Sequence, residues 1–381
     1  MYDWITLEGL GKAMGQAKAR GNKEERVQQA LDRKKEEELA VAERRRAVGQ
    51  TIDRFKKLYA TKVCLAPHTD HEGPIVSAHT LSREAFLRPI SRDGRVYAIR
   101  GNMSSDRNKF PMNLELQGLR DVSVFNGFCR THDRDLFASI ETRPFEFSPE
   151  QLFMLAYRAV ARESYYKRKQ FESFPSAEQF AAMHGIKEEL NISEEAEKYL
   201  SEVLESASDI ESLKSKLDEM LLEKNWGRLI SRALIFPEPP TLVASFATEP
   251  TTDFNGNRLQ DLSNRNVKVS FLMGSIIPLK SGCAAIFSWL DDANDAPVRF
   301  FESLAHSGSP AKAIIHAALD ISENVALSPK WYESLPPKAH RYIESRIFNF
   351  EQDDIYATKG NPLARSPELG DWGAPTMFES H

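Results

Sequence analysis

"NGFCRTHDRDLF", residues 126–137, places Cys129 and His132 three positions apart at the start of a predicted helix. The chain has only three cysteines and nine histidines in 381 residues. Two of these cysteines and four of these histidines fall between positions 64 and 132. Tetrahedral zinc is usually held by four N or S ligands that come as two close pairs from separate segments. The sequence therefore predicts a metal site, with Cys129 and His132 as one ligand pair.

The second ligand pair begins at Cys64, in the stretch "CLAPHTDHEGPIVSAH". Three histidines compete to complete it, namely His68, His71 and His79, and His68 has the shorter, knuckle-like spacing. If His79 is the fourth ligand, the site is closed and purely structural. In a metal-free interpretation, Cys64 and Cys129 are ordinary buried thiols.

Short strands surround these residues. "PIVSAH" and "RVYAIR" alternate apolar and other side chains and predict two strands. "RDGR" at 92–95 supplies an Asp-Gly turn before the second of them. "DVSVFNGFC" predicts a further strand and "THDRDLFASIE" a helix. The pattern therefore predicts a small zinc-stabilised, treble-clef-like ββα module over residues 61–147.

The run from Cys64 to Glu141 resembles an uncharacterised bacterial family. In that family a Cys-rich knuckle leads into a strand ending in Ser-x-His, and a "FxGFCxxHDxxLFxxIE" segment closes the pattern. This chain shows "IVSAHTLSREAFLRPISRDGRVYAI" and "VFNGFCRTHDRDLFASIE", and the resemblance covers about 80 of its 381 residues. The family's second knuckle cysteine is absent here. Counting back eight residues from His79 reaches His71, which the resemblance makes the first choice for that ligand, with His68 second.

The same layout resembles the HNH, or ββα-metal, nuclease motif. There a histidine at a strand end is a general base on water, and a His or Asp on the next helix holds a catalytic metal. His79 matches the first role by position and Asp133 the second. An imidazole with a pKa of about 6.5 can take a proton at neutral pH. A carboxylate-bound Mg²⁺ or Mn²⁺ stabilises charge that develops on a phosphate. Candidates for the motif's middle asparagine are Asn102, Asn113 and Asn126.

Two functions follow from these resemblances. The first is a metal-dependent HNH-like nuclease or nucleic-acid-binding protein, with a role in bacterial antiviral defence against foreign DNA by analogy. The second is a non-enzymatic interaction protein whose zinc ion only fixes the fold. In that interpretation Asp133 and Asp135 serve to favour the helix N-terminus electrostatically, and Glu141 is a surface acid.

Residues 1–60 are predicted to form a long basic helix. Residues 11–62 carry 15 Lys or Arg against 8 Asp or Glu, and positions 16–59 contain no proline. From Val41 onward, Val48 and Phe55 recur every seven residues, which is the spacing of a seam that packs on a partner helix. We therefore expect self-association or a partner protein at this helix, and a nucleic-acid arm is the alternative.

The rest of the chain completes an α+β architecture. Residues 148–238 are predicted to be a helical region, which begins with Ser148 as N-cap before Pro149. Ser208 with Glu211 forms a capping-box pattern that predicts a further helix start. Strands such as "TLVASFAT" and "CAAIFSWL", followed by helices, predict a C-terminal α+β domain over 239–350, with Cys283 in its core. The Pro/Gly-rich tail, 351–381, is expected to be poorly ordered unless it docks.

Composition limits the remaining choices. With 41% hydrophobic residues, the chain has enough apolar material for folded cores. Residues 80–170 carry 16 basic and 11 acidic side chains, whereas 171–240 carry 7 and 15, so the basic half is a weak footprint for DNA or RNA. No apolar run reaches the roughly 20 residues of a membrane span. Three cysteines and a start without secretory-signal features favour a cytoplasmic protein.

Overall fold

The computed structural model describes residues 60–101, 112–172, 189–264, 267–348 and 366–380, with scattered positions between 27 and 57 and Leu363. The chain divides into two compact units, Met1–Arg54 with Phe174–Tyr199, and Phe55–Ser173 with Leu200–His381. The helices and strands described below lie in the second unit, apart from the first part of one long helix. The protein is a mixture of helices and strands, as the α+β prediction requires.

An eight-stranded antiparallel sheet organises the second unit, with strand order β10-β5-β8-β7-β6-β9-β2-β3. Its strands are β2 (Arg95–Gly101), β3 (Met112–Gly118), β5 (Leu229–Phe236), β6 (Leu242–Thr248), β7 (Leu272–Pro278), β8 (Cys283–Leu290), β9 (Val325–Leu327) and β10 (Thr376–Ser380). The predicted strands "TLVASFAT" and "CAAIFSWL" are confirmed as β6 and β8.

The sheet separates two hydrophobic cores. Along β8, Phe287 and Trp289 belong to one core, whereas Ala284 and Ile286 belong to the other. Successive side chains of a strand point to opposite faces, so alternate residues enter different cores. Every residue of β8 is buried, because helices cover the sheet on both sides. The prediction that Cys283 is a core residue is confirmed.

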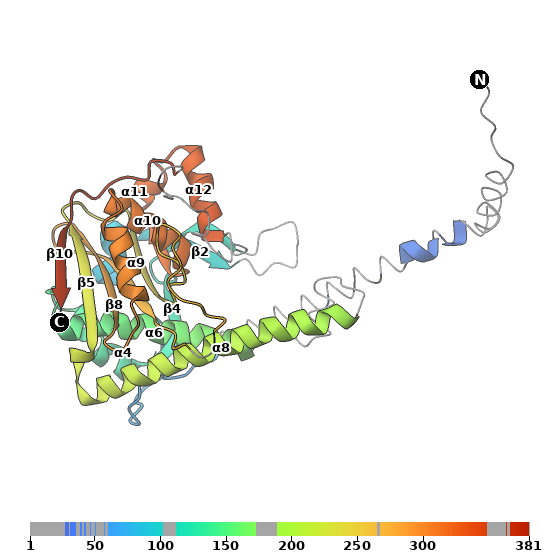
Figure 1. Cartoon of the computed structure of the whole chain (residues 1–381), viewed down its shortest axis with the longest axis horizontal. Helices are drawn as coiled ribbons and strands as arrows, with labels where there is room; N and C mark the ends of the chain where they lie inside the picture. Colours follow the sequence, from blue (N-terminus) through green and yellow to red (C-terminus); the bar gives the residue numbers. More distant parts are fainter. Residues whose placement is uncertain are drawn as a thin grey trace, which may run out of the picture. The chain divides into compact units, whose positions relative to one another are not determined.

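Helices form the outer layers (Figure 1). One core, here the α9/α10 core, also contains residues of the helices that follow β8. Those helices are α9 (Ala296–Ala305), α10 (Pro310–Ile321), α11 (Pro329–Tyr332) and α12 (Pro337–Phe348). The other core, here the α6/α8 core, joins the opposite sheet face to α6 (Pro149–Glu172) and α8 (Glu189–Glu223).

The predicted metal-binding segment contributes a second, two-stranded sheet. β1 (Ile75–His79) pairs antiparallel with β4 (Val124–Cys129), and α4 (Arg130–Leu136) and α5 (Ala138–Glu141) follow β4 directly. Between β1 and β4 lie η1 (Arg83–Leu87) and α3 (Arg88–Ile90), followed by β2 and β3. Gly127 sits against the ring of Phe125, where an added Cβ would lie 2.2 Å from a ring carbon, so β4 requires glycine there.

Two sequence predictions about strands are corrected. The "RVYAIR" strand is β2, but it pairs with β3 and β9 in the large sheet rather than with β1, which pairs with β4. The region predicted to be helical over 148–238 contains β5, which pairs with β8 along eight residues. The Asp-Gly turn is confirmed, since Asp93 and Gly94 both have positive φ, as a tight hairpin turn needs.

One predicted helix start in this region is confirmed and another is wrong. α6 begins at Pro149, and the hydroxyl of Ser148 accepts a hydrogen bond from the Gln151 N–H at 3.3 Å, which confirms the N-cap. Ser208 and Glu211 do not start a helix, because both lie inside the continuous α8. The good helix formers on either side of Ser208 carry the helix through the capping-box pattern.

The structure describes little of the N-terminal segment and much of the C-terminal tail. Most of the predicted N-terminal helix lies outside the described residues, and its described positions, such as 31–35, are helical. The described part of the tail is docked: β10 pairs with β5, and Trp372 is fully buried. Among the helices that the structure describes, none is long and apolar enough to cross a membrane.

Candidate metal centre

Four side chains converge where the irregular segment before β1 meets the junction of β4 and α4. Backbone hydrogen bonds hold that segment in place, from the N–H of Leu65 to the carbonyl of Gly127 at 2.8 Å and from Val63 to Asn126 at 3.2 Å. They align Cys64 beside the end of β4, where Cys129 is the last strand residue. Two ligands thus come from each of two segments far apart in sequence.

The predicted set of Cys64, His71, Cys129 and His132 is the group that gathers. Their ligand atoms all lie within 4.8 Å of one another. His132 Nδ1 is the common neighbour, at 3.4 Å from Cys64 Sγ, 3.3 Å from Cys129 Sγ and 3.4 Å from His71 Nδ1. A tetrahedron with Zn–S of about 2.3 Å and Zn–N of about 2.0 Å has an N–N edge of roughly 3.3 Å and S–N edges of roughly 3.5 Å. These three separations therefore match the edges of a zinc site.

Hydrogen bonding alone does not account for this convergence. A neutral imidazole nitrogen is either one donor or one acceptor, yet His132 Nδ1 has three polar neighbours. An ion at the centre satisfies all three contacts together. Burial raises the pKa of Cys64, so a thiolate at this position needs a compensating cation. The Cys129 N–H also donates to Cys64 Sγ at 3.3 Å, which favours a negatively charged sulfur.

The four ligands differ in exposure. Cys129 and His132 are buried, Cys64 is half-buried and His71 is exposed. Cys64 packs against the α6/α8 core, which includes Phe128 and Phe137 at 0% exposure. The site is thus anchored in the hydrophobic interior on one side and open to solvent at His71.

His68 lies next to this group without joining it. Its ring stacks on His132 with the centroids 5.3 Å apart, and its buried Nδ1 has no hydrogen-bond partner among the described residues. Of the two candidates within the segment before β1, the structure brings His71 rather than His68 into the group. The resemblance to the bacterial family, which counted back from His79, gave the signal for that choice.

His79 lies outside the group of four. It ends β1, is half-buried, and its Nε2 lies 3.0 Å from the carbonyl oxygen of Leu119. Since a carbonyl only accepts, Nε2 carries the hydrogen and Nδ1 keeps its lone pair. Burial lowers the pKa of His79 below 6.5, and the charges of Arg158 and Arg83 add to that effect. The ring is therefore neutral and oriented at pH 7.

Asp133 belongs to a second polar cluster, with Glu141 and Arg158. Arg158, on α6, donates to Asp133 Oδ1 at 3.2 Å and to Glu141 Oε1 at 2.8 Å, with its guanidinium 4.2 Å from the ring centroid of Phe137. Its side chain is only 1% exposed. Burial raises the pKa of Asp133, while the charge of Arg158 opposes that shift. The cluster ties α4 and α5 to α6.

Sequence reasoning missed Arg158, although its signal is visible. It lies in "QLFMLAYRAVARE", inside the apolar stripe of α6, where a fully buried arginine needs acidic partners.

The three asparagine candidates do not lie together. Asn126 lies on β4, where its Oδ1 accepts from Ser77 at 3.4 Å, Asn113 lies on β3 of the large sheet, and Asn102 is outside the described residues.

No protein-family model, curated protein or solved structure matches this chain.

Proposed function

We propose that residues 64–141 contain a treble-clef-like zinc module in which the zinc ion is structural. Two cysteines and two histidines are a standard ligand set for closed structural zinc. The order of parts supports the proposal: a ligand-bearing loop, the β1–β4 pair, then α4 with ligands at its start. The insertion of β2 and β3 between β1 and β4 lengthens the hairpin and leaves the pairing intact.

On this module we further propose an HNH-like nuclease that hydrolyses phosphodiester bonds in DNA or RNA. The observation that carries this proposal is His79, a neutral, half-buried imidazole at a strand end, with one nitrogen fixed by the Leu119 carbonyl. A general base needs this combination of orientation and protonation state. His79 Nδ1 would take a proton from water, the water oxygen would attack phosphorus, and the P–O bond to the leaving nucleoside would break, with solvent supplying its proton.

Asp133 would hold the divalent cation, Mg²⁺ or Mn²⁺, that such a reaction uses. Asp133 and His79 lie close enough for a charge on His79 to lower the pKa of Asp133. Bound there, the cation would stabilise negative charge developing on the phosphate. Arg158 and Glu141 would position the carboxylate, since Arg158 holds one of its oxygens.

The second candidate is a non-enzymatic interaction protein, and the Arg158 cluster favours it. Arg158 already compensates Asp133 and Glu141, so these acids have a structural role without any cation. In this case zinc and the ion cluster both fix the fold, and the protein acts through its surfaces.

Polynucleotide cleavage separates the two candidates. Plasmid DNA and single-stranded oligonucleotides are incubated with zinc-loaded protein and added Mg²⁺ or Mn²⁺. The nuclease proposal predicts metal-dependent cleavage that falls by about 10²-fold or more in His79→Ala. His306→Ala is the matched control, because His306 is exposed after α9 and outside the module. Absent cleavage, or cleavage that survives in His79→Ala, would remove the nuclease proposal and leave the interaction protein.

A further inference from the structure

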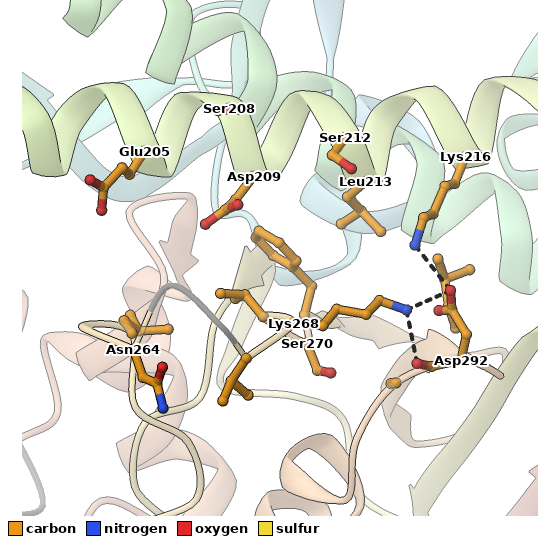
Figure 2. A pocket seen from close by; sticks show the side chains of 16 residues that line it. Glu205, Ser208, Asp209, Ser212, Leu213, Lys216, Asn264, Lys268, Ser270 and Asp292 are labelled. Carbon is orange, nitrogen blue, oxygen red and sulfur yellow. Dashed lines mark hydrogen bonds and ion pairs between the residues drawn. The ribbon is translucent and has the colours of Figure 1, made fainter.

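A pocket of about 460 Å³ lies between α8 and the segments next to β7 and β8 (Figure 2). One wall is the face of α8 from Glu205 to Lys216, and the other is formed by Leu262, Asn264, residues 267–271, Leu290, Asp292 and Ala293. Its volume falls in the range of roughly 300–1,000 Å³ that small-molecule sites occupy. None of the residues used for the metal centre or for the Arg158 cluster lines it.

One end of the pocket is acidic. Asp209 and Glu205 project from consecutive turns of α8, and Asp209 joins no hydrogen bond or ion pair among the described residues. Glu205 accepts a hydrogen bond from Ser201 at 3.0 Å. Burial raises the pKa of Asp209, the neighbouring Glu205 adds to the rise, and Lys167 opposes it. A cationic group bound at this end would offset both the burial of the Asp209 carboxylate and its repulsion by Glu205.

The other end carries excess positive charge. Lys216 Nζ lies 3.0 Å from Asp292, and Lys268 Nζ lies 2.5 Å from the same carboxylate. Lys268 also donates to the Asp292 carbonyl at 2.9 Å. Two ammonium groups thus share one carboxylate, which leaves one positive charge for an anionic group. Figure 2 shows both lysines directed toward Asp292, at the opposite end from Glu205.

Apolar side chains also line the pocket. Leu213 and Phe271 are among them, at 6% and 7% exposure. Leu262 and Val267, also in the lining, are 43% and 46% exposed, which is unusual for large apolar side chains. Asp209 and Lys216 are seven residues apart on one helix face, a rise of roughly 10 Å. A hydrocarbon chain of five or six carbons spans such a distance with a hydrogen bond at each end.

We propose that this pocket binds a small zwitterion whose ammonium and carboxylate groups are separated by a hydrocarbon chain. The ammonium pairs with Asp209 and Glu205, the chain lies on Leu213 and Phe271, and the carboxylate reaches Lys216 and Lys268. This proposal is independent of the nuclease and of the zinc site.

The test is calorimetric titration of the full-length, zinc-loaded chain with 6-aminohexanoate. Hexylamine, hexanoate and 1,6-diaminohexane are the comparison probes, since they share the hydrocarbon chain and each lacks one of the two matched charges. We expect 6-aminohexanoate to bind at least about tenfold more tightly than each of the three, because only it engages both ends. Absent binding, or equal binding of the diamine or of hexanoate, would overturn the proposal.

Three variants localise the binding. Asp209→Asn and Lys268→Gln are each expected to weaken 6-aminohexanoate binding by about tenfold or more. Glu219→Gln is the matched control, because Glu219 lies exposed on α8 outside the pocket, and it should leave the affinity unchanged. If Asp209→Asn and Lys268→Gln bind as the parent does, the ligand sits elsewhere and the assignment is wrong. Thermal unfolding curves verify that each variant is folded.

Discussion

Two side chains connect segments that are far apart in the sequence, His132 in the metal-ligand group and Arg158 in the polar cluster. His132 Nδ1 is the atom around which two thiols and a second imidazole gather. Arg158 connects two acids through a guanidinium whose fork makes separate hydrogen bonds to each. The first role could be predicted from the Cys-x-x-His spacing. The second could not, because the acids are 17 and 25 residues away and only the packing of α6 brings them together.

Replacing Cys129 tests the ligand role of a single side chain. In Cys129→Ser we expect zinc content to fall from one ion per chain to a small fraction, with a lower unfolding temperature, because zinc binding is coupled to folding. The measurements are metal analysis and thermal unfolding of purified protein. Cys283→Ala is the control: Cys283 is equally buried but lies in the α9/α10 core, so this variant should keep its zinc.

Removing Arg158 should be costly for stability. Arg158→Met leaves Asp133 and Glu141 without their cation while both remain largely buried, and we expect a loss of about 3 kcal/mol. Denaturant unfolding provides the measurement. Arg134→Met is the matched control, since Arg134 and Asp135 form an exposed pair that solvent screens, and its loss should change stability little. Equal losses of unfolding free energy in the two variants would mean that the buried cluster stabilises the fold no more than an exposed ion pair does.

Among the helices and strands, local pattern predicted the segments better than their partners. β1, β4, β6 and β8 lie where alternating or continuous apolar runs placed them. The pairing of β2 with β9 could not be predicted, because alternation marks a strand but does not say which edge it joins. β5 follows a long helix in a region dominated by helix formers. Its short apolar run therefore did not predict a strand separate from the helical region. The helix start predicted at Ser208 was wrong, because capping-box patterns also occur inside continuous helices.

The docked tail is a small element with a large expected effect. Trp372 is fully buried beside Phe236, with ring centroids 5.4 Å apart, and its Nε1 donates to Thr241 Oγ1 at 3.2 Å. Trp372→Ala should therefore lower the free energy of unfolding by about 3–5 kcal/mol. Met377→Ala, on β10 itself, should change it by less than about 0.5 kcal/mol, because Met377 is 50% exposed. Urea titration of both variants checks this difference.

In the molecule as a whole, one sheet joins segments that the sequence placed in separate domains. Strands from residues 95–118 and from 229–380 share it, and its two faces carry the two large cores. Composition predicted a mixed fold with real cores. The shared sheet could not be foreseen, because β2 and β9 are separated by more than 200 residues and no local signal links them.

Global stability should depend on pH through His316. This histidine is 0% exposed in the α9/α10 side of the molecule, and burial lowers its pKa to about 4, with Arg346 and Lys312 adding to the shift. The unfolded chain then binds more protons between pH 6.5 and 4, so stability should fall as the pH drops through that window. The upper limit for this one group is about 3 kcal/mol. In His316→Gln the slope of stability against pH should decrease, whereas in His306→Gln it should not.

The most direct test of the zinc module is X-ray absorption at the zinc edge on protein purified without chelators. Convergence of Cys64, His71, Cys129 and His132 on one ion predicts two sulfur ligands at about 2.3 Å and two nitrogen ligands at about 2.0 Å. His71→Ala should remove one imidazole nitrogen from the zinc ligands, with a water oxygen in its place, and keep both sulfurs. Protein that carries no zinc, or zinc surrounded by oxygen and nitrogen alone, would contradict the account.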